Sequence, residues 1–230
     1  MSAYLFDPFI ASLAITGEKT RFPVARIFCV GRNYAAHAKE MGGSEREPPF
    51  FFMKPLTALL SVEHENTKLP IPPGTQNYHH EVELVVALRK GGKAIKPAQA
   101  LECIYGYAIG LDMTRRDLQR AFADQKKPWE MGKAADFSAP IGPLHKASYT
   151  GEMKKGAIVL NVDNEQRQCG DLADMIWPIP ELIAHLSNFF TLAAGDIIFT
   201  GTPEGVGPIL SGQNIKASIS GLETISLQAV

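Results

Sequence analysis

The chain has 230 residues, with 23 Lys and Arg against 24 Asp and Glu and a formal charge of −1 at pH 7. This balance argues against non-specific binding to nucleic acid, which depends on an excess of cations that neutralise phosphates. The length allows a substantial hydrophobic core. Because no linker, repeat or low-complexity segment divides the chain, we expect one folded domain.

The three cysteines, Cys29, Cys103 and Cys169, are widely spaced. They form neither a CxxC metal pattern nor a disulfide framework, which fits a reducing compartment. The N-terminus lacks the basic region of a secretory signal, and no apolar run reaches the length of a membrane span. We therefore expect a soluble, cytoplasmic protein without a membrane partner.

The first part of the chain predicts two strands. Residues 1–25 carry turn signals and are expected to form a short N-terminal extension. The apolar residues 26–30 predict a short strand. Phe50-Phe51-Phe52-Met53 predicts a second strand, which we expect to be buried because it is apolar throughout.

Between these strands, the pattern predicts a helix followed by a polar loop. Asn33 is a suitable N-cap for a helix over residues 34–41. On that helix His37 and Glu40 are three residues apart and share a face. Such a pair is either an ordinary surface pair or a catalytic dyad. Residues 42–49 are polar and rich in turn formers, and we expect a mobile loop there.

Two glutamates stand out in the run Tyr78–Val86, which alternates like a strand. Side chains along a strand alternate between faces, so Glu81 and Glu83 point the same way. Two carboxylates on one face repel each other unless a cation or a proton lies between them. The pair is either the wet face of an edge strand or a buried metal site. The apolar neighbours favour burial, and buried carboxylates need partners.

A third carboxylate, Asp112, follows the apolar run Gly106–Leu111, where a strand gives way to a helix. Three hard oxygen ligands without a cysteine or paired histidine set suit Mg²⁺ or Mn²⁺, with Ca²⁺ also compatible in a crystal. The helix is expected to open at Thr114-x-x-Asp117, an Asp variant of the capping box, and to end before Pro128.

The remaining pattern favours a β-rich α+β fold. Residues 97–103 predict a short helix with proline in its first turn. Strands expected at 158–161 and 197–200 bracket a helix at 179–189. The glycine-rich loop 201–208 lacks the GK[ST] of a phosphate-binding loop and fails the dinucleotide-binding spacing. Because strands outnumber helices and do not alternate regularly with them, a doubly wound sheet is disfavoured.

Taken in order, these residues resemble the fumarylacetoacetate hydrolase family, and most closely its short acylpyruvase and oxaloacetate-decarboxylase-like branch. The resemblance covers roughly residues 26–230 and rests on an ordered set of motifs. These are Gly31-Arg32-Asn33-Tyr34-x-x-His37-x-x-Glu40-Met41, Lys54-Pro55, His79-His80-Glu81-x-Glu83-Leu84, Leu111-Asp112-Met113-Thr114-x-Arg116-Asp117-x-Gln119, Lys133 and Thr200-Gly201-Thr202-Pro203-x-Gly205-Val206-Gly207.

The resemblance implies a mixed β-roll in a single catalytic domain over residues 26–230, usually as a homodimer. It implies roles for three groups of residues. Glu81, Glu83 and Asp112 would bind Mg²⁺ or Mn²⁺; His37, Glu40 and Lys133 would be catalytic; and Lys54, Arg116, Gln119 and Thr202 would contact the substrate.

The implied substrate is a small 2-oxo acid. The reaction expected first is hydrolysis of the C3–C4 bond of an acylpyruvate such as fumarylpyruvate, with His37 as the base that activates water. The alternatives are an oxaloacetate decarboxylase or tautomerase, and a decarboxylase or isomerase of 2-oxo acids from aromatic degradation. A binding protein in which the carboxylates are only structural is a further alternative, and turnover of any 2-oxo acid would exclude it.

Overall fold

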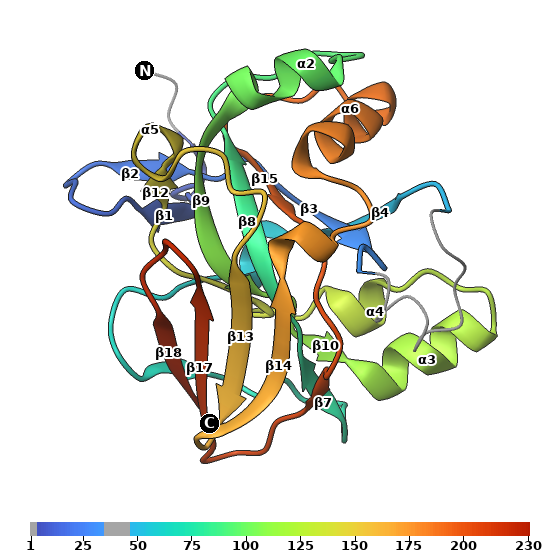
Figure 1. Cartoon of the computed structure of the whole chain (residues 1–230). Coiled ribbons are helices and arrows are strands. Elements are labelled where there is room, and N and C mark those ends of the chain that lie inside the picture. The colour runs from blue at the N-terminus through green and yellow to red at the C-terminus, as the bar shows by residue number, and fades with distance from the viewer. Residues whose placement is uncertain (1–3, 35–46) are drawn as a thin grey trace.

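A computed structural model of the chain describes residues 4–34 and 47–230 (Figure 1). Its centre consists of two β-sheets that pack face to face, with helices at the upper end and at one side. The predicted class, a β-rich α+β fold, is confirmed. Among the described residues, no helix combines the length and the apolarity needed to cross a membrane.

The larger sheet has eight strands within the described part of the chain, in the order β4-β3-β15-β8-β9-β11-β5, with β12 paired to β9. It is mixed, because β3 runs parallel to β15 and β11 parallel to β5 while the other pairs are antiparallel. Its strands are β3 (Arg26–Gly31), β4 (Phe50–Lys54), β5 (Leu59–Ser61), β8 (Val82–Leu88), β9 (Ile104–Leu111), β11 (Ala139–Ile141), β12 (His145–Lys146) and β15 (Asp196–Phe199).

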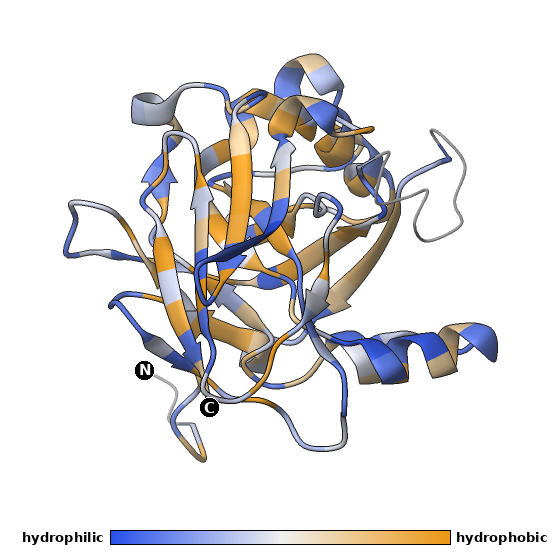
Figure 2. Ribbon diagram, turned by 60° about the horizontal axis from the view of Figure 1, so that its bottom comes forward, coloured by the Kyte–Doolittle hydropathy of each residue, from blue (hydrophilic) through white to orange (hydrophobic). Residues whose placement is uncertain are grey.

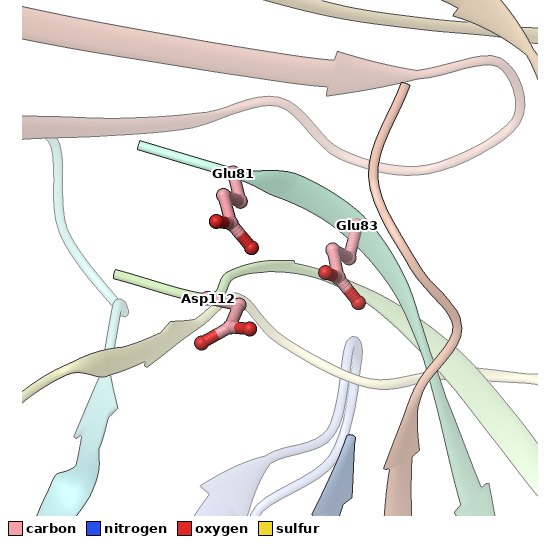
Figure 3. Close-up of side chains that lie close together, drawn as sticks. All are labelled: Glu81, Glu83 and Asp112. Carbon is pink, nitrogen blue, oxygen red and sulfur yellow. The ribbon is translucent and has the colours of Figure 1, made fainter. Parts of the chain in front are cut away.

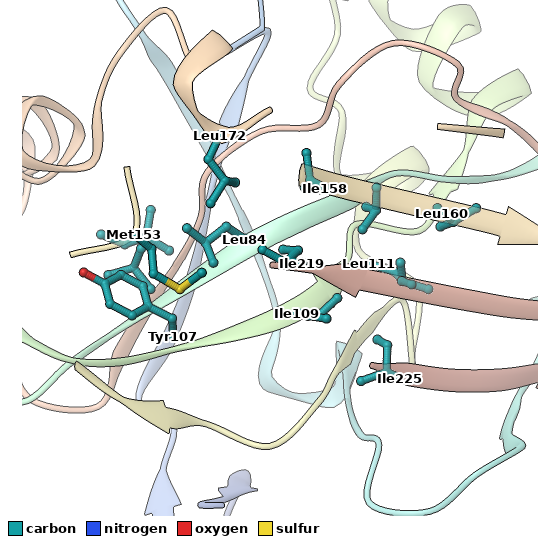
Figure 4. Packing of buried hydrophobic residues seen from close by; sticks show 14 of the residues in the cluster. Leu84, Tyr107, Ile109, Leu111, Met153, Ile158, Leu160, Leu172, Ile219 and Ile225 are labelled. Atoms are coloured by element: carbon teal, nitrogen blue, oxygen red, sulfur yellow. The ribbon is translucent and has the colours of Figure 1, made fainter. Parts of the chain in front are cut away.

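The second sheet has the order β14-β13-β17-β18-β6. Its strands are β6 (Thr67–Leu69), β13 (Ala157–Val162), β14 (Glu165–Asp171), β17 (Asn214–Ile219) and β18 (Ile225–Ala229). Figure 4 shows the core between the two sheets, where Leu84 and Ile109 of the larger sheet face Ile158, Ile219 and Ile225 of the smaller one.

Two small sheets complete the strands. The hairpin of β1 (Ser12–Ala14) and β2 (Arg21–Pro23) packs on the outer face of the larger sheet through Leu13 and Phe22. A three-stranded sheet is formed by β7 (Tyr78–His80), β10 (Thr114–Arg115) and β16 (Gly207–Pro208). The division into an extension of residues 1–25 and a domain of residues 26–230 stays a prediction.

The helices are short and peripheral. Figure 2 shows the hydrophobic residues gathered on the central strands, whereas α3 is largely hydrophilic and extends from the side of the molecule. The helices are α2 (Pro97–Ala100), α3 (Arg116–Asp124), α4 (Glu130–Lys133), α5 (Ala147–Thr150) and α6 (Ile179–Phe189), with 3₁₀ turns η1 (Leu56–Ala58), η2 (Leu101–Cys103) and η3 (Leu172–Asp174).

Most of the predicted elements lie where the pattern put them. The short helix after residue 96 has proline at its start, and the later strands and helix match. The strand at Phe50–Met53 also exists, but the expectation that it is buried is wrong, because Phe50 and Met53 are 38% and 37% exposed. The helix expected over residues 34–41 and most of the loop over 42–49 fall in the range 35–46, outside the described residues.

The strand β8 explains why the glutamates are buried. Leu84 and Val86 point into the core between the sheets, while Val85 and Ala87 point into a second apolar cluster on the opposite face. Both faces of this strand are therefore covered, and the edge-strand interpretation of the Glu pair is wrong. Glu83 shares the face of Val85 and Ala87, since residues two apart on a strand lie on one side.

Candidate metal centre and active site

Three carboxylates meet where β8 begins and β9 ends (Figure 3). Glu81 lies just before β8, Glu83 is in it, and Asp112 follows β9, whose last residues pair with the start of β8. The backbone N–H of Asp112 donates to the carbonyl of Glu81 at 2.9 Å, which fixes these two residues side by side. One carboxylate oxygen from each of the three residues lies within 4.8 Å of the others, and all three side chains are buried. The predicted convergence of the three is what the structure shows.

The ammonium of Lys133, at the end of α4, lies between two of these carboxylates. Its Nζ is 2.8 Å from Oε2 of Glu81 and 2.6 Å from Oδ2 of Asp112, and it donates to the hydroxyl of Thr114 at 2.7 Å. Burial works to lower the pKa of Lys133, but the charges of Asp112 and Glu81 outweigh it and raise that pKa above its usual value. The lysine is therefore charged and partly compensates the carboxylates.

Lys133 reaches this position because α4 packs closely on α3. A Cβ on Gly132 would lie 2.7 Å from Cβ and 2.8 Å from Cα of Gln119, closer than side chains approach one another. Gly132 thus allows the contact between the two helices that carries Lys133 to the carboxylates.

The ammonium of Lys54 is enclosed by protein atoms. Its side chain is fully buried, and Nζ donates to the carbonyl of Met113 and the hydroxyl of Ser138, each at 3.0 Å, and to the carbonyl of Lys133. It also lies 2.9 Å from Oδ1 of Asp112. Its predicted contact with the substrate stays a prediction, and these contacts favour a role in positioning Asp112 and Lys133.

Arg116 and Gln119, on the first turns of α3, are both buried. The guanidinium of Arg116 forms an ion pair with Oε1 of Glu81 and donates to Oε1 of Gln119 at 2.5 Å. Because the oxygen of the Gln119 carboxamide is used by Arg116, its nitrogen is the end left to donate to a ligand. The side chain of Arg120, next to Gln119 in the sequence, is exposed.

The expected capping box at Thr114 and Asp117 is wrong. The helix begins at Arg116, and no side chain caps its start. The hydroxyl of Thr114 instead lies among the site residues, 3.2 Å from Oε1 of Glu81, and the carboxylate of Asp117 accepts from Thr75 and from the backbone of Gln76. Sequence reasoning therefore missed Thr114 as a site residue, and nothing in the local pattern distinguishes it from a cap.

Glu83 is the least compensated of the carboxylates. Its Oε2 accepts a hydrogen bond of 2.7 Å from the backbone N–H of Gly201, in the loop after β15. Burial, reinforced by the charges of Asp112 and Glu81, raises the pKa of Glu83 well above its usual value. A buried carboxylate of this kind gains most when a cation lies next to it.

The residues present fit a divalent cation. Oδ1 of Asp112 is buried and has no hydrogen bond to the described residues, although the ammonium of Lys54 is nearby. Three buried oxygen donors, one of them without a directed hydrogen bond, suit a hard cation such as Mg²⁺ or Mn²⁺. When ionised, the three carboxylates are balanced one for one by three buried cations, namely Lys54, Lys133 and Arg116. A divalent cation would add two positive charges to the pocket, which suits an anionic ligand.

Thr202, after Gly201, is held by a buried glutamine that sequence analysis did not find. Its hydroxyl donates to the carbonyl of Val82 at 2.8 Å and accepts from Nε2 of Gln168 at 2.8 Å. Gln168 is fully buried on β14, and its Oε1 lies 2.9 Å from Nδ1 of His80. Since the hydroxyl of Thr202 is already paired, a substrate contact there would fall to other atoms of this residue.

A small pocket opens onto these groups. Of the residues predicted for the site, those lining it are Glu81, Glu83, Asp112, Arg116, Gln119, Lys133 and Thr202, together with residues not predicted, chiefly Arg32, Phe52 and Trp129. Lys54 is not part of this lining. His37 and Glu40, the predicted dyad, lie outside the described residues, so their roles stay predictions.

Residues 26–229 match the family described as fumarylacetoacetate (FAA) hydrolase C-terminal. The chain belongs to this family. The family resemblance inferred from the motifs is confirmed.

A solved structure that is very similar is that of fumarylpyruvate hydrolase from Pseudomonas aeruginosa in complex with Mn²⁺ and pyruvate. It is 51% identical, with a TM-score of 0.97, and the match covers 99% of both chains. A protein 51% identical to this chain therefore has a divalent cation in its structure, and this chain has a buried Glu-Glu-Asp group suited to one.

Other relatives carry a different activity in their names. An oxaloacetate tautomerase of Escherichia coli is 43% identical over 206 residues, covering 89% of this chain and 93% of the relative. A mitochondrial oxaloacetate tautomerase of rice is 40% identical over 210 residues, covering 91% and 93%. Proteins named as a hydrolase and as tautomerases thus resemble this chain at 51% and at 40–43% identity, respectively.

Proposed function

We propose that the protein is a divalent-metal-dependent hydrolase that cleaves the C3–C4 bond of acylpyruvates, with fumarylpyruvate as the leading substrate. The observation that carries the proposal is the buried group of Glu81, Glu83 and Asp112 next to Lys133 in a pocket. Similarity to the fumarylpyruvate hydrolase over 99% of both chains supports the choice of substrate. We further propose Mg²⁺ or Mn²⁺ as the metal, a cytoplasmic location and a homodimeric assembly.

The reaction consumes one water. The oxygen of water adds to C4, the C3–C4 bond breaks, and its electron pair remains on C3 as the enolate of pyruvate. C3 then takes up a proton, and the acyl group leaves as a carboxylic acid. Two charges therefore need stabilisation in turn, the oxyanion on C4 and the enolate of the pyruvate half.

The site offers partners for each charge. A bound Mg²⁺ or Mn²⁺ would supply Lewis acidity toward the oxygens of a 2-oxo acid. Lys133 is a buried ammonium that would stabilise negative charge in its neighbourhood, and the carboxamide nitrogen of Gln119 would donate to an oxyanion. His37, oriented by Glu40, is the proposed base that takes a proton from water.

Oxaloacetate is the second candidate substrate, favoured by the names of relatives at 40–43% identity. Oxaloacetate is also a 2-oxo acid. In its enolate the negative charge is likewise shared between C3 and the oxygen on C2. Tautomerisation passes through the enolate of oxaloacetate, whereas decarboxylation releases the C4 carboxylate as CO₂ and leaves the enolate of pyruvate. Neither reaction needs attack by water. The same cationic pocket is therefore suited to either chemistry.

The test is a panel of fumarylpyruvate, simpler acylpyruvates and oxaloacetate, assayed with Mg²⁺ and with Mn²⁺. Formation of pyruvate measured with lactate dehydrogenase reports hydrolysis and decarboxylation, while loss of enol absorbance without pyruvate reports tautomerisation. We expect fumarylpyruvate to have the highest kcat/KM, activity to vanish with excess chelator, and Mg²⁺ or Mn²⁺ to restore it. Faster turnover of oxaloacetate than of any acylpyruvate would favour the second candidate, and full activity in excess chelator would exclude the metal.

A further inference from the structure

A groove leads from the carboxylate pocket to the surface. The pocket that holds Glu81, Glu83 and Asp112 and a more open cavity beside it share three lining residues, Arg32, Phe52 and Trp129. The open cavity is lined in addition by Phe50, Phe51 and Glu130. Its walls are β4 and α4, which lie side by side in Figure 1. A substrate held at the carboxylates by its pyruvate end would have this groove open to its other end.

The walls of the groove are aromatic. The rings of Phe50 and Trp129 meet edge to face with centroids 5.2 Å apart, and Phe52 lies 6.3 Å from Trp129. Gly31 makes room for this arrangement, because a Cβ there would lie 2.0 Å from Cζ of Phe50. The exposure of β4, which the apolar sequence did not predict, is therefore part of the groove. Flat ring surfaces suit a flat, conjugated chain.

Arg32 is placed at the junction of the two cavities by the fold. Its φ of +58° is in the left-handed region, which is costly for a residue other than glycine and is kept where the surroundings fix the backbone. The fixing comes from Asn33, whose carboxamide donates to the carbonyls of Thr200 and Trp177 and accepts from the N–H of Trp177 at 2.8 Å.

The guanidinium of Arg32 differs from the other cations of the pocket. Arg116 and Lys133 are paired with Glu81 and Asp112. Arg32 forms no ion pair with any residue in ranges 4–34 and 47–230, and its buried Nε has no hydrogen-bond partner there. The charge of Arg32 is thus available to a ligand. Glu130 lines only the outer cavity and not the carboxylate pocket. A substrate chain that extends outward from the carboxylates therefore meets the positive charge of Arg32 before the negative charge of Glu130.

We propose that Arg32, Phe52 and Trp129 form the subsite for the acyl group, and that this subsite selects a flat, unsaturated acyl chain that ends in a carboxylate. Arg32 would bind that terminal carboxylate, while Phe52 and Trp129 would contact the conjugated chain. The inference rests on the proposed acylpyruvate hydrolysis, which it refines by assigning the part of the protein that reads the group beyond C4.

Two substrates and two variants test the charge. Fumarylpyruvate and crotonylpyruvate have the same unsaturated skeleton and differ in whether it ends in a carboxylate or a methyl group. Arg32→Met should lower kcat/KM for fumarylpyruvate by about 10- to 100-fold, the worth of a charge-assisted hydrogen bond, and leave crotonylpyruvate within about twofold. Arg32→Lys should recover part of the loss. Equal losses on both substrates, or no loss on fumarylpyruvate, would overturn the proposal.

The matched control is Arg115→Met. Arg115, in β10, has an Nε that is likewise buried with no hydrogen-bond partner in ranges 4–34 and 47–230, but it lines neither cavity. This variant removes the same charge from the protein and should leave the preference for fumarylpyruvate unchanged. A loss of preference equal to that of Arg32→Met would show that the effect is one of overall charge, and would overturn the subsite.

A binding measurement separates this inference from the proposed function. In a Trp177→Phe background, Trp129 is the remaining tryptophan of the sequence, and its fluorescence reports ligands in the groove. With Mn²⁺ bound, fumarate should change this fluorescence at a concentration at least about tenfold lower than crotonate, and Arg32→Met should abolish the difference. If the protein hydrolyses neither acylpyruvate but shows this preference, the proposed function fails and the subsite stands. If fumarate and crotonate bind alike, the subsite fails whatever the protein hydrolyses.

Discussion

Nζ of Lys133 lies 2.6 Å from Oδ2 of Asp112, so a short helix after residue 129 is joined to the end of a central strand. The same ammonium contacts Glu81 at 2.8 Å, on the neighbouring strand. One cation therefore links α4 to two of the three carboxylates of the candidate metal centre. Lys133 therefore neutralises part of the negative charge of Glu81 and Asp112, which a bound metal would otherwise have to neutralise alone.

Replacing this cation should separate catalysis from metal binding. In Lys133→Met, kcat/KM should fall by about 10²–10³-fold, as when a preorganised donor to a developing negative charge is lost. Mn²⁺ binding, measured by electron paramagnetic resonance, should be retained or tightened, because the two carboxylates lose a competing positive charge. Lys127→Met is the control, since Lys127 is exposed and lies near the ring of Phe122. Loss of Mn²⁺ binding in Lys133→Met would show instead that the lysine holds the carboxylates in place.

A second prediction concerns the buried carboxamide of Gln168. Its Oε1 lies close to the His80 ring and the N–H of Val82, and its Nε2 donates to Thr202 and to the carbonyl of Pro203. Gln168→Met removes a hydrogen-bond partner from each of these groups, and each buried group left with no other partner costs about 1–3 kcal/mol. We expect a clear drop in the free energy of unfolding, and weaker Mn²⁺ binding because Val82 lies between the two glutamates of the candidate metal centre.

The control for Gln168 is Gln166→Met, on the same strand but exposed. It should change neither the unfolding midpoint in urea nor the Mn²⁺ affinity. If Gln168→Met behaves like this control, the carboxamide does not hold the loop after β15 against β8.

His145, next to the residue that contacts the N-terminal hairpin, leads to a prediction about how stability depends on pH. Nε2 of His145 accepts a hydrogen bond from the backbone N–H of Glu223 at 3.1 Å, which requires that nitrogen to be unprotonated. Burial lowers the pKa of His145 below its usual 6.5, and the opposing charge of Glu223 does not cancel the effect. Beside it, Leu144 exchanges backbone hydrogen bonds with Ala14 and Thr16 of the hairpin segment.

A histidine whose pKa is lowered by folding contributes its full stability above the pKa that it has in the unfolded chain. As the pH falls through that unfolded pKa, the unfolded chain takes up the proton first, and the stability is lost. Between about pH 7.5 and 5.5, the melting temperature of the wild type should therefore fall more than that of His145→Gln, whose carboxamide oxygen can still accept from Glu223. Parallel melting curves of the two proteins across this range would contradict the role given to His145.

How far the sequence predicted the site depends on the kind of signal. The alternation of side chains between the two faces of a strand is a local property, so the shared face of Glu81 and Glu83 was predictable from their spacing alone. The burial of that face was indicated by apolar neighbours, and the two sheets supply it. Asp112 at the end of a strand was predictable for the same reason.

The errors have a physical cause in common, because each depends on a contact across the fold. Thr114 has the sequence context of a helix cap, but its hydroxyl accepts from Lys133 and donates to Glu81. Phe50–Met53 is apolar enough for a core, yet its rings line a groove. Gln168 belongs to a polar strand, β14, that the pattern did not predict, and its partners lie more than thirty residues away in sequence.

The last prediction separates the two chemistries of the family. Hydrolysis needs a base that activates water, whereas tautomerisation or decarboxylation of oxaloacetate needs mainly the metal and the cations around the enolate. If His37 is the base, His37→Ala should lower hydrolysis of fumarylpyruvate by about 10²–10⁴-fold, the usual range for loss of general-base catalysis. Turnover of oxaloacetate should fall much less, and Mn²⁺ binding should hold because His37 is not among the three proposed ligands. Both rates are measured on one preparation of the variant, so that differences in metal loading cancel. Equal losses on the two substrates would remove the argument that His37 activates water, and would place its role in a step that both reactions share.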